Sequence, residues 1–155
     1  MKYWIASGNR ENWNVVKEKN IWGVPKGSKG LHSRVNVSDH ILIYVRSETH
    51  GHDVLPSAIM GDFTVTEIFE DSNVIFTAPS QMGDEVFPYR FRIKPVKVFK
   101  EPVEIKPLIS ELGFVTNKTQ WSGHFRHAMR EITEEDYKRI IKASNGNYIN
   151  KSPFL

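Results

Sequence analysis

The most informative stretch of this chain is Ser7-Gly8-Asn9-Arg10-Glu11-Asn12-Trp13, together with Ile21-Trp22-Gly23-Val24-Pro25 further along. An amphipathic run that carries lysines connects the two. Gly23 and Pro25 disfavour a helix or a strand around Trp22, so the pattern predicts an indole in a loop. An indole in that position can meet a flat ligand such as a nucleic-acid base. Burial of Trp22 in the core is the alternative.

Positive charge is concentrated around Trp22. The whole chain is only mildly basic, with a net charge of +3 and a pI near 9.1. The segment from 17 to 34 contains the single acid Glu18 and five cations, Lys17, Lys19, Lys26, Lys29 and Arg34. A local excess of this kind attracts phosphate. Solubilising lysines on a loop-rich surface are the alternative interpretation.

Length and composition predict one compact domain with a sizeable core, because 39% of the 155 residues are hydrophobic and 12% are aromatic. We expect this domain over residues 1–144 and a loosely ordered tail over 145–155. The chain has no cysteine, which excludes disulfides, a thiolate nucleophile and cysteine-based zinc sites. It shows neither a signal-peptide pattern nor an apolar run of about 18 residues, so we expect a soluble cytoplasmic protein without a membrane partner.

Hydrophobic periodicity and turn residues predict several short strands with helices between them. Asn9 is expected to cap a helix over 10–19, and Thr133 with Asp136 is expected to open a last helix that ends near Ala143. The expected strands are 3–6, 40–46, 59–68, 74–77 and 89–94, the last ended or bent by Pro95. The remaining expectations are a loop over 23–30, a polar turn over 48–56, a short helix over 105–112 and a helical stretch over 121–129. Such a series favours a barrel or a sandwich.

The strand at 89–94 is expected to have one apolar and one basic face. Alternation places Tyr89, Phe91 and Ile93 on the first face and Arg90, Arg92 and Lys94 on the second.

No catalytic constellation stands out, and we expect neither an enzyme nor a bound metal or cofactor. His50, His52 and Asp53 form a weak metal pattern, and His124 and His127 could share one helix face. Neither group brings a third ligand or a general base at motif spacing, and the common nucleophile, phosphate-loop and zinc-protease motifs are missing from the sequence.

Three of the four tryptophans are expected in the core, namely Trp4, Trp13 and Trp121. Trp22 differs because its neighbours place it in a loop. Stacking of a base on an exposed indole is worth about 1 to 3 kcal/mol, and nearby cations would add a salt-sensitive contribution from phosphate.

Motifs over residues 2–142 resemble those of the EVE family, whose members have a PUA-like fold. They are Tyr-Trp-Ile at 3–5, Asn-Arg-Glu-Asn-Trp at 9–13, Trp-Gly-Val-Pro at 22–25, Ile-Tyr-Val-Arg at 43–46, Ile-Met-Gly at 59–61 and Phe-Pro-Tyr-Arg at 87–90. The resemblance implies an α+β fold, a twisted, mostly antiparallel β-barrel flanked by helices.

EVE proteins are in turn similar to YTH domains, which read N6-methyladenosine in RNA. That similarity implies that Trp22 forms the first wall of an aromatic cage and that Ser7, Gly8 and Asn9 form its polar rim. The chain departs from the YTH pattern at Gly8 and Ala6, where YTH readers carry asparagine and lysine. The second tryptophan wall has no clear counterpart, and the corresponding region offers Phe76, Met82 and Phe87.

The sequence therefore predicts a module that binds nucleic acid, RNA or DNA, with a modified base in an aromatic pocket. The expected base contacts are Trp22, Ser7, Gly8, Asn9, Gly23, Val24, Met82 and Tyr89, and the expected backbone contacts are Lys26, Lys29, Arg34 and Arg46. Three alternatives remain open: Met82 only fills the loop, Tyr89 packs in the barrel, and Arg34 and Arg46 are solvated or ion-paired. A pocket for a small molecule or nucleotide is the second functional interpretation, and a nucleoside-modifying enzyme is the third. The oligomeric state stays open.

Overall fold

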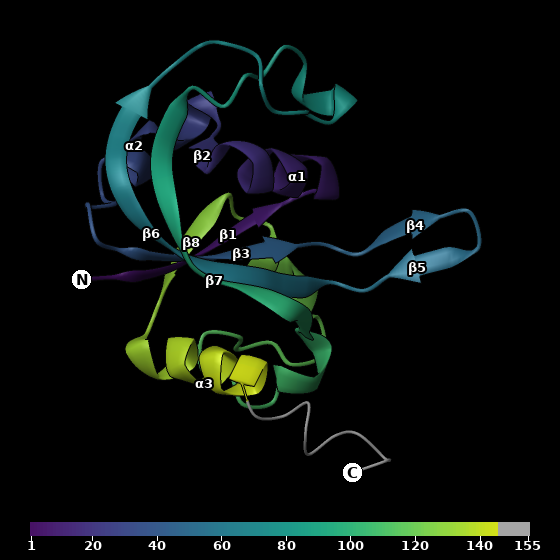
Figure 1. Ribbon diagram of the computed structural model, residues 1–155. Helices are drawn as coiled ribbons and strands as arrows, with labels where there is room; N and C mark the ends of the chain where they lie inside the picture. The colour runs from purple at the N-terminus through teal and green to yellow at the C-terminus, as the bar shows by residue number, and fades with distance from the viewer. Residues whose placement is uncertain (146–155) are drawn as a thin grey trace.

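A six-stranded mixed sheet forms the centre of the computed structural model, which describes residues 1–145 (Figure 1). The strand order is β2 (Ile21–Val24), β7 (Tyr89–Glu104), β6 (Ala58–Glu70), β3 (His40–Val45), β1 (Tyr3–Gly8) and β8 (Met129–Ile132). β1 and β3 are parallel, and the other neighbours are antiparallel. The sheet curls into a half-barrel that is open between β2 and β8. Beyond Asn145, the predicted tail lies outside the described residues.

Helices cover both sides of this sheet. α1 (Arg10–Lys19) and the short α2 (Lys29–His32) lie on one side, and α3 (Glu134–Asn145) lies on the other (Figure 1). The predicted helix starts are confirmed: the side chain of Asn9 accepts from the backbone N–H of Asn12 at 2.8 Å, and that of Thr133 accepts from Asp136 at 3.1 Å. Within residues 1–145, no helix is long and apolar enough to cross a membrane.

Two hydrophobic cores result because successive side chains of a strand point to opposite faces. Trp4 and Ala6 of β1 pack on the α1 side with Trp13, Val16 and Trp22. Ile5 of β1 packs on the α3 side with the following buried residues of other elements: Leu42, Tyr44, Ile140 and Ala143. The three tryptophans of the first core are nearly inaccessible to solvent.

The α3 side also holds a buried polar network. Asp62 accepts a hydrogen bond from the Tyr137 hydroxyl at 2.6 Å and lies 2.9 Å from Nδ1 of His40. Burial and the neighbouring Asp62 carboxyl raise the pKa of Tyr137 above its ordinary value. This network joins α3 to β3 and β6.

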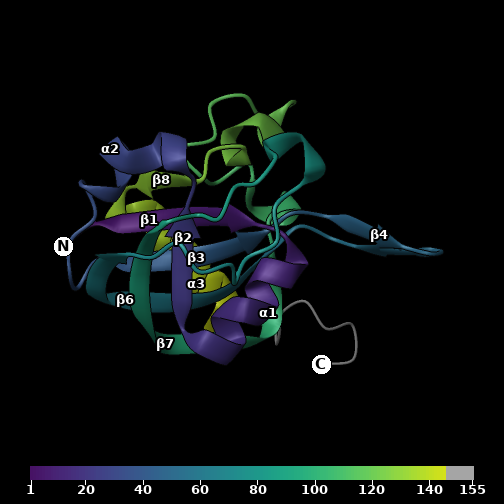
Figure 2. The same ribbon diagram turned by 90° about the horizontal axis from the view of Figure 1, so that it is seen from above.

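Three stretches differ from the prediction in how their backbone is paired. The predicted polar turn is a hairpin of β4 (Glu48–His50) and β5 (Asp53–Leu55), which projects from the body (Figure 2). The predicted strand over 74–77 is irregular, because the backbone of Thr77 pairs with the side chain of Asn12 through both its N–H and its carbonyl group. β7 continues past Pro95, where a register shift against β6 accommodates the missing N–H.

Helical structure also differs from the prediction in three places. The expected helix over 105–112 is a 3₁₀ turn, η3 (Lys106–Leu108), followed by bends. The stretch over 121–129 is a 3₁₀ turn, η4 (Trp121–Phe125), that leads into β8. The expected loop over 23–30 instead contains the end of β2, another 3₁₀ turn, η1 (Lys26–Ser28), and the start of α2. A further 3₁₀ turn, η2 (Ser80–Met82), lies in the loop before β7.

Candidate ligand-binding site

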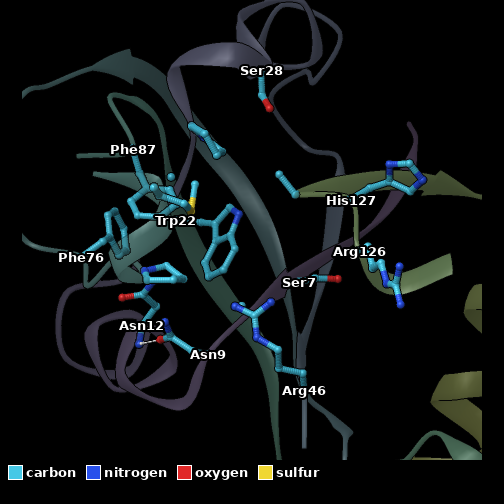
Figure 3. Close-up of a pocket in the computed structure, with 16 residues that line it drawn as sticks. Ser7, Asn9, Asn12, Trp22, Ser28, Arg46, Phe76, Phe87, Arg126 and His127 are labelled. Atoms are coloured by element: carbon cyan, nitrogen blue, oxygen red, sulfur yellow. Dashed lines mark hydrogen bonds between the residues drawn. The ribbon is translucent and has the colours of Figure 1, made fainter. Parts of the chain in front are cut away.

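A cavity of about 250 Å³ opens where the carboxyl ends of β1 and β3 meet (Figure 3). These strands are parallel, so Gly8 pairs with Val45 and the segments that follow both strands leave the sheet at the same place. The start of β8 joins them, because the backbone N–H of Ser7 donates to the carbonyl of Ala128 at 3.0 Å. The lining residues are Ser7, Gly8, Asn9, Asn12, Trp22, Gly23, Pro25, Ser28, Arg46, Phe76, Pro79, Met82, Phe87, Arg126, His127 and Ala128.

Trp22 lines this cavity, but it is not the free-standing loop residue that the sequence predicts. It lies in β2, paired with Phe91 of β7, and only 4% of its surface is exposed. The prediction is wrong on this point because Gly23 is an ordinary member of the short edge strand and Pro25 follows only after the strand has ended. Trp22 therefore belongs to the core and to the cavity wall at once.

Gly8 determines how closely the Trp22 ring can approach β1. A β-carbon at this position would lie 2.6 Å from Cη2 of Trp22, which is shorter than a non-bonded contact allows. Any side chain at position 8 would thus push the indole away from the strand. Gly8, which departs from the asparagine of YTH readers, is the residue that this placement of Trp22 requires.

The indole N–H of Trp22 has no hydrogen-bond partner within residues 1–145, although the atom is buried. A buried donor without a partner destabilises a fold by about 1 to 3 kcal/mol. Trp4 shows the usual arrangement, since its indole N–H donates to a carboxylate oxygen of Asp39 at 3.0 Å.

Apolar side chains from the segment between β6 and β7 continue the wall that Trp22 begins. Phe76 lies edge-on to Trp22, with ring centroids 6.2 Å apart, and Phe87 lies edge-on to Phe76 at 5.8 Å. Gly23 permits this packing, because a β-carbon there would lie 2.8 Å from both the Phe76 ring and the Phe87 carbonyl oxygen. The half-buried Pro79 and the exposed Met82 complete the wall.

Arg90 holds this wall in place from beneath. Its guanidinium group donates to the carbonyl oxygens of Asn73, Val86 and Phe87, and lies 5.5 Å from the ring of Phe76. The predicted basic face of the strand is therefore wrong at this position, because Arg90 is 1% exposed while Arg92 and Lys94 are exposed. Burial lowers the pKa of Arg90, and Asp71 at 3.7 Å opposes that shift.

Three basic side chains border the mouth of the cavity. Arg46 follows β3, and Arg126 and His127 precede β8; all three are exposed (Figure 3). Five of the other arginines lie within ion-pair distance of a carboxylate, namely Arg10, Arg34, Arg90, Arg92 and Arg139. Arg130 contacts His124 and lies over Phe114. Across residues 1–145, Arg46 and Arg126 are thus the arginines that have neither an ion pair nor a side-chain hydrogen bond.

The structure brings seven of the predicted contacts to the cavity, namely Ser7, Gly8, Asn9, Trp22, Gly23, Met82 and Arg46. Five others lie elsewhere. Val24 is buried in the core, and Tyr89 packs against His32 with ring centroids 5.3 Å apart. Arg34 lies 5.5 Å from the Trp4 ring and 3.6 Å from a carboxylate oxygen of Glu131. Lys26 and Lys29 are exposed on η1 and α2, outside the lining. The ligand contacts themselves stay predictions.

Several lining residues were not singled out from the sequence. Asn12 had a signal in the Glu-Asn pair of the motif, and its side chain anchors Thr77. Arg126 and His127 had none, because the only pattern around them was a histidine pair. His124 does not share that edge: its Nε2 accepts from the backbone N–H of Asn117 at 3.1 Å. Within residues 1–145, no three or more histidine, aspartate or glutamate side chains are grouped for a metal ion.

Comparison with known proteins agrees with the architecture. The EVE domain model matches residues 2–143. The chain belongs to the EVE domain family. A UPF0310 protein of Pyrococcus horikoshii is 48% identical over 145 residues, which span 92% of this chain and 98% of the relative.

Solved structures show the same fold at low sequence identity. The Mmi1 YTH domain superposes with a TM-score of 0.63 at 16% identity and covers 97% of this chain and 100% of its own. A complex of the Mmi1 YTH domain with RNA gives a TM-score of 0.62 at 17% identity, covering 97% and 81% of the two chains. The predicted α+β, PUA-like fold is thereby confirmed.

Proposed function

We propose that this EVE domain binds nucleic acid and accommodates a modified base in the cavity at the carboxyl end of β1. One observation carries the proposal: Arg46 and Arg126, the two arginines of the described chain with neither an ion pair nor a side-chain hydrogen bond, both border a cavity that no carboxylate lines. Elsewhere in the described chain, arginine charge is largely neutralised by neighbouring acids. At the cavity, the neutralising charge is left for a ligand to supply.

The positions of these arginines suit a nucleotide that is part of a chain. Arg46 and Arg126 come from different segments and are exposed, whereas Trp22 and Phe76 are buried. A base that enters the cavity leaves its flanking phosphates at the rim, where guanidinium groups form charge-assisted hydrogen bonds with phosphate oxygens. A solved structure with this fold is a complex of the Mmi1 YTH domain with RNA, which supports a nucleic-acid ligand.

Cavity size and wall chemistry favour a single base with an apolar substituent. Pockets for drug-sized ligands span about 300 to 1,000 Å³, so a cavity of about 250 Å³ suits something smaller. Phe76, Phe87, Pro79 and Met82 offer apolar surface to a methyl group. Burial of one methyl contributes about 0.8 kcal/mol, so a methylated base should bind about fourfold more tightly than its parent.

The test is a titration of short RNA and DNA oligonucleotides that carry one N6-methyladenine, one 5-methylcytosine or the unmodified parent base. We expect one methylated member to bind more tightly than its parent, and the affinity to fall steeply as salt is raised. Each phosphate that an arginine neutralises contributes about 0.7 to 0.9 to the slope of log K against log salt. A salt-independent affinity for free nucleotides would instead support the small-molecule alternative.

Arginine variants locate the binding site. Arg46→Gln and Arg126→Gln should each reduce the salt slope by about 0.7 to 0.9. Arg92→Gln is the matched control, because it removes the same charge from the exposed side of β7, where Arg92 pairs with Glu67 at 3.0 Å. Equal losses in all three variants would indicate attraction to the overall charge and would contradict a site at the cavity.

A further inference from the structure

The N–H of Trp22 is a donor that the chain itself leaves without a partner. Trp22 is 4% exposed, and its Nε1 makes no hydrogen bond within residues 1–145. One other buried side-chain nitrogen there shares this state, Nε of Arg10, but it lies 3.7 Å from a carboxylate oxygen of Glu48. The great majority of buried polar side-chain atoms in native structures are paired. An unpaired donor in a cavity wall points to a partner that the ligand brings.

Packing fixes the direction of this donor. Gly8 leaves no room between its backbone and Cη2 of the indole, and Phe76 lies edge-on against the same ring. Figure 3 shows the nitrogen edge of the ring turned toward the space that Ser28 and His127 border. The ring therefore holds its N–H toward the cavity before any ligand arrives.

The guanidinium groups around this space are also donors, whereas the ring nitrogens of His127 can donate or accept. Guanidinium groups, here Arg46 and Arg126, have no acceptor atom. The Asn12 amide is committed to Thr77 on both sides, and the cavity lining contains neither aspartate nor glutamate. The hydroxyls of Ser7 and Ser28 donate or accept, so they adapt to either kind of ligand. A ligand N–H placed opposite Trp22 would face another donor, and neither would be satisfied.

We propose that the cavity selects bases whose inserted edge carries a carbonyl oxygen, which accepts the hydrogen bond from Nε1 of Trp22, over bases that present an amino group there. This inference rests on the proposed base-binding function. The N–H is recessed, and an exocyclic oxygen projects beyond the ring and reaches such a donor before a ring nitrogen does. Trp22 is then the residue that determines specificity, and the apolar wall only adds affinity for a methyl group.

Pairs of bases that differ by oxo and amino groups test this directly. The full chain is titrated with oligonucleotides that are identical except for one position, which holds 5-methyluracil or 5-methylcytosine, hypoxanthine or adenine, or an abasic site. Because a mismatched pair leaves the buried donor unsatisfied, we expect the oxo member of at least one pair to bind about tenfold more tightly. Trp22→Phe, which keeps an aromatic ring and removes the N–H, should equalise the members of that pair.

Phe76→Leu is the matched control in the same cavity. Phe76 is buried and has no polar group, so its substitution should weaken both members of a pair alike and leave their ratio unchanged. The ratio is thus insensitive to a general loss of packing. In the wild-type chain, the ¹⁵N-indole resonance of Trp22 should also shift on addition of the oxo oligonucleotide and much less with the amino one.

The outcomes separate the two proposals. Equal affinity for oxo and amino members, both above the abasic oligonucleotide, would overturn the selectivity and leave base binding intact. An oxo preference that survives Trp22→Phe would also overturn the role of Trp22. Binding of no base more tightly than the abasic site would overturn the proposed function itself.

Discussion

A buried tryptophan lies at each end of β1. The indole N–H of one is hydrogen-bonded, and that of the other is not. At the start of the strand, Trp4 donates to Asp39 at 3.0 Å, and Arg34 lies over its ring while pairing with Glu131. At the end of the strand, Trp22 packs against Gly8 with its N–H unpaired, and Arg46 nearby has no acidic partner. A tryptophan and an arginine both have acidic partners at the start of the strand, and neither has one at its end.

This contrast teaches where the fold depends on its polar groups and where it does not. Asp39 is 1% exposed and accepts from the backbone N–H of Lys2, the backbone N–H of Asn36 and the Trp4 indole. Removing such an acceptor leaves three donors unsatisfied, one of them fully buried. A group that is already unpaired has no such internal bond to lose, so its removal should affect ligand binding far more than folding.

Removal of the Asp39 side chain should give the largest effect. Asp39→Ala leaves three N–H groups without an acceptor, among them the buried indole of Trp4, and should lower the free energy of unfolding by about 3 to 5 kcal/mol. Urea denaturation followed by fluorescence measures the loss. Ser7→Ala at the other end of β1 is the control, because the Ser7 hydroxyl makes no hydrogen bond within the described part of the chain. We expect a change of less than about 0.5 kcal/mol there. Similar losses at both ends would contradict the contrast.

Overpacking at Gly8 should give the next largest loss in the free energy of unfolding. Gly8→Ala places a methyl group 2.6 Å from the Trp22 ring, so the ring or the strand must shift. We expect a loss of about 1 to 3 kcal/mol in the free energy of unfolding, measured in the same way. Gly27→Ala serves as the control, since nothing lies within 4 Å of a β-carbon at that position. If Gly8→Ala were as mild as Gly27→Ala, the close approach of Trp22 to β1 would be refuted.

Local sequence signals predicted the parts of this comparison that depend on neighbouring residues. The Asn9 cap, the Thr133 cap and the strands over 3–6 and 40–46 are encoded within a few residues, and the structure confirms them. The role of Arg90 is only partly local, because two of its acceptors, Val86 and Phe87, directly precede β7 while the third, Asn73, lies in the turn after β6. The free mouth of the cavity is non-local. Arg126 meets the end of β1 because β8 pairs beside it, a pairing between segments far apart in sequence.

Matched substitutions of the two tryptophans isolate the hydrogen bond itself. Trp4→Phe and Trp22→Phe remove the same atoms from the same hydrophobic core, but only the first leaves a carboxylate without its donor. Trp4→Phe should therefore lower the free energy of unfolding by about 1.5 kcal/mol more than Trp22→Phe. Thermal and urea unfolding of both variants give the difference. Equal losses would mean that the Trp22 N–H is satisfied in solution and that the two ends of the strand are alike.

Substitution of Arg34 and of Arg46 should give the smallest difference in the free energy of unfolding. The dependence of that difference on salt is the informative measurement. Arg34 pairs with Glu131 at 3.6 Å on the surface, so Arg34→Gln should lower the free energy of unfolding by about 0.5 kcal/mol at low salt and by less at high salt. Arg46 has no acid beside it and lines the same cavity as Arg126. Arg46→Gln should therefore leave stability unchanged or raise it slightly at low salt. A destabilised Arg46→Gln would show that this charge supports the fold, and the cavity mouth would then lose the feature that distinguishes it from the Asp39 end.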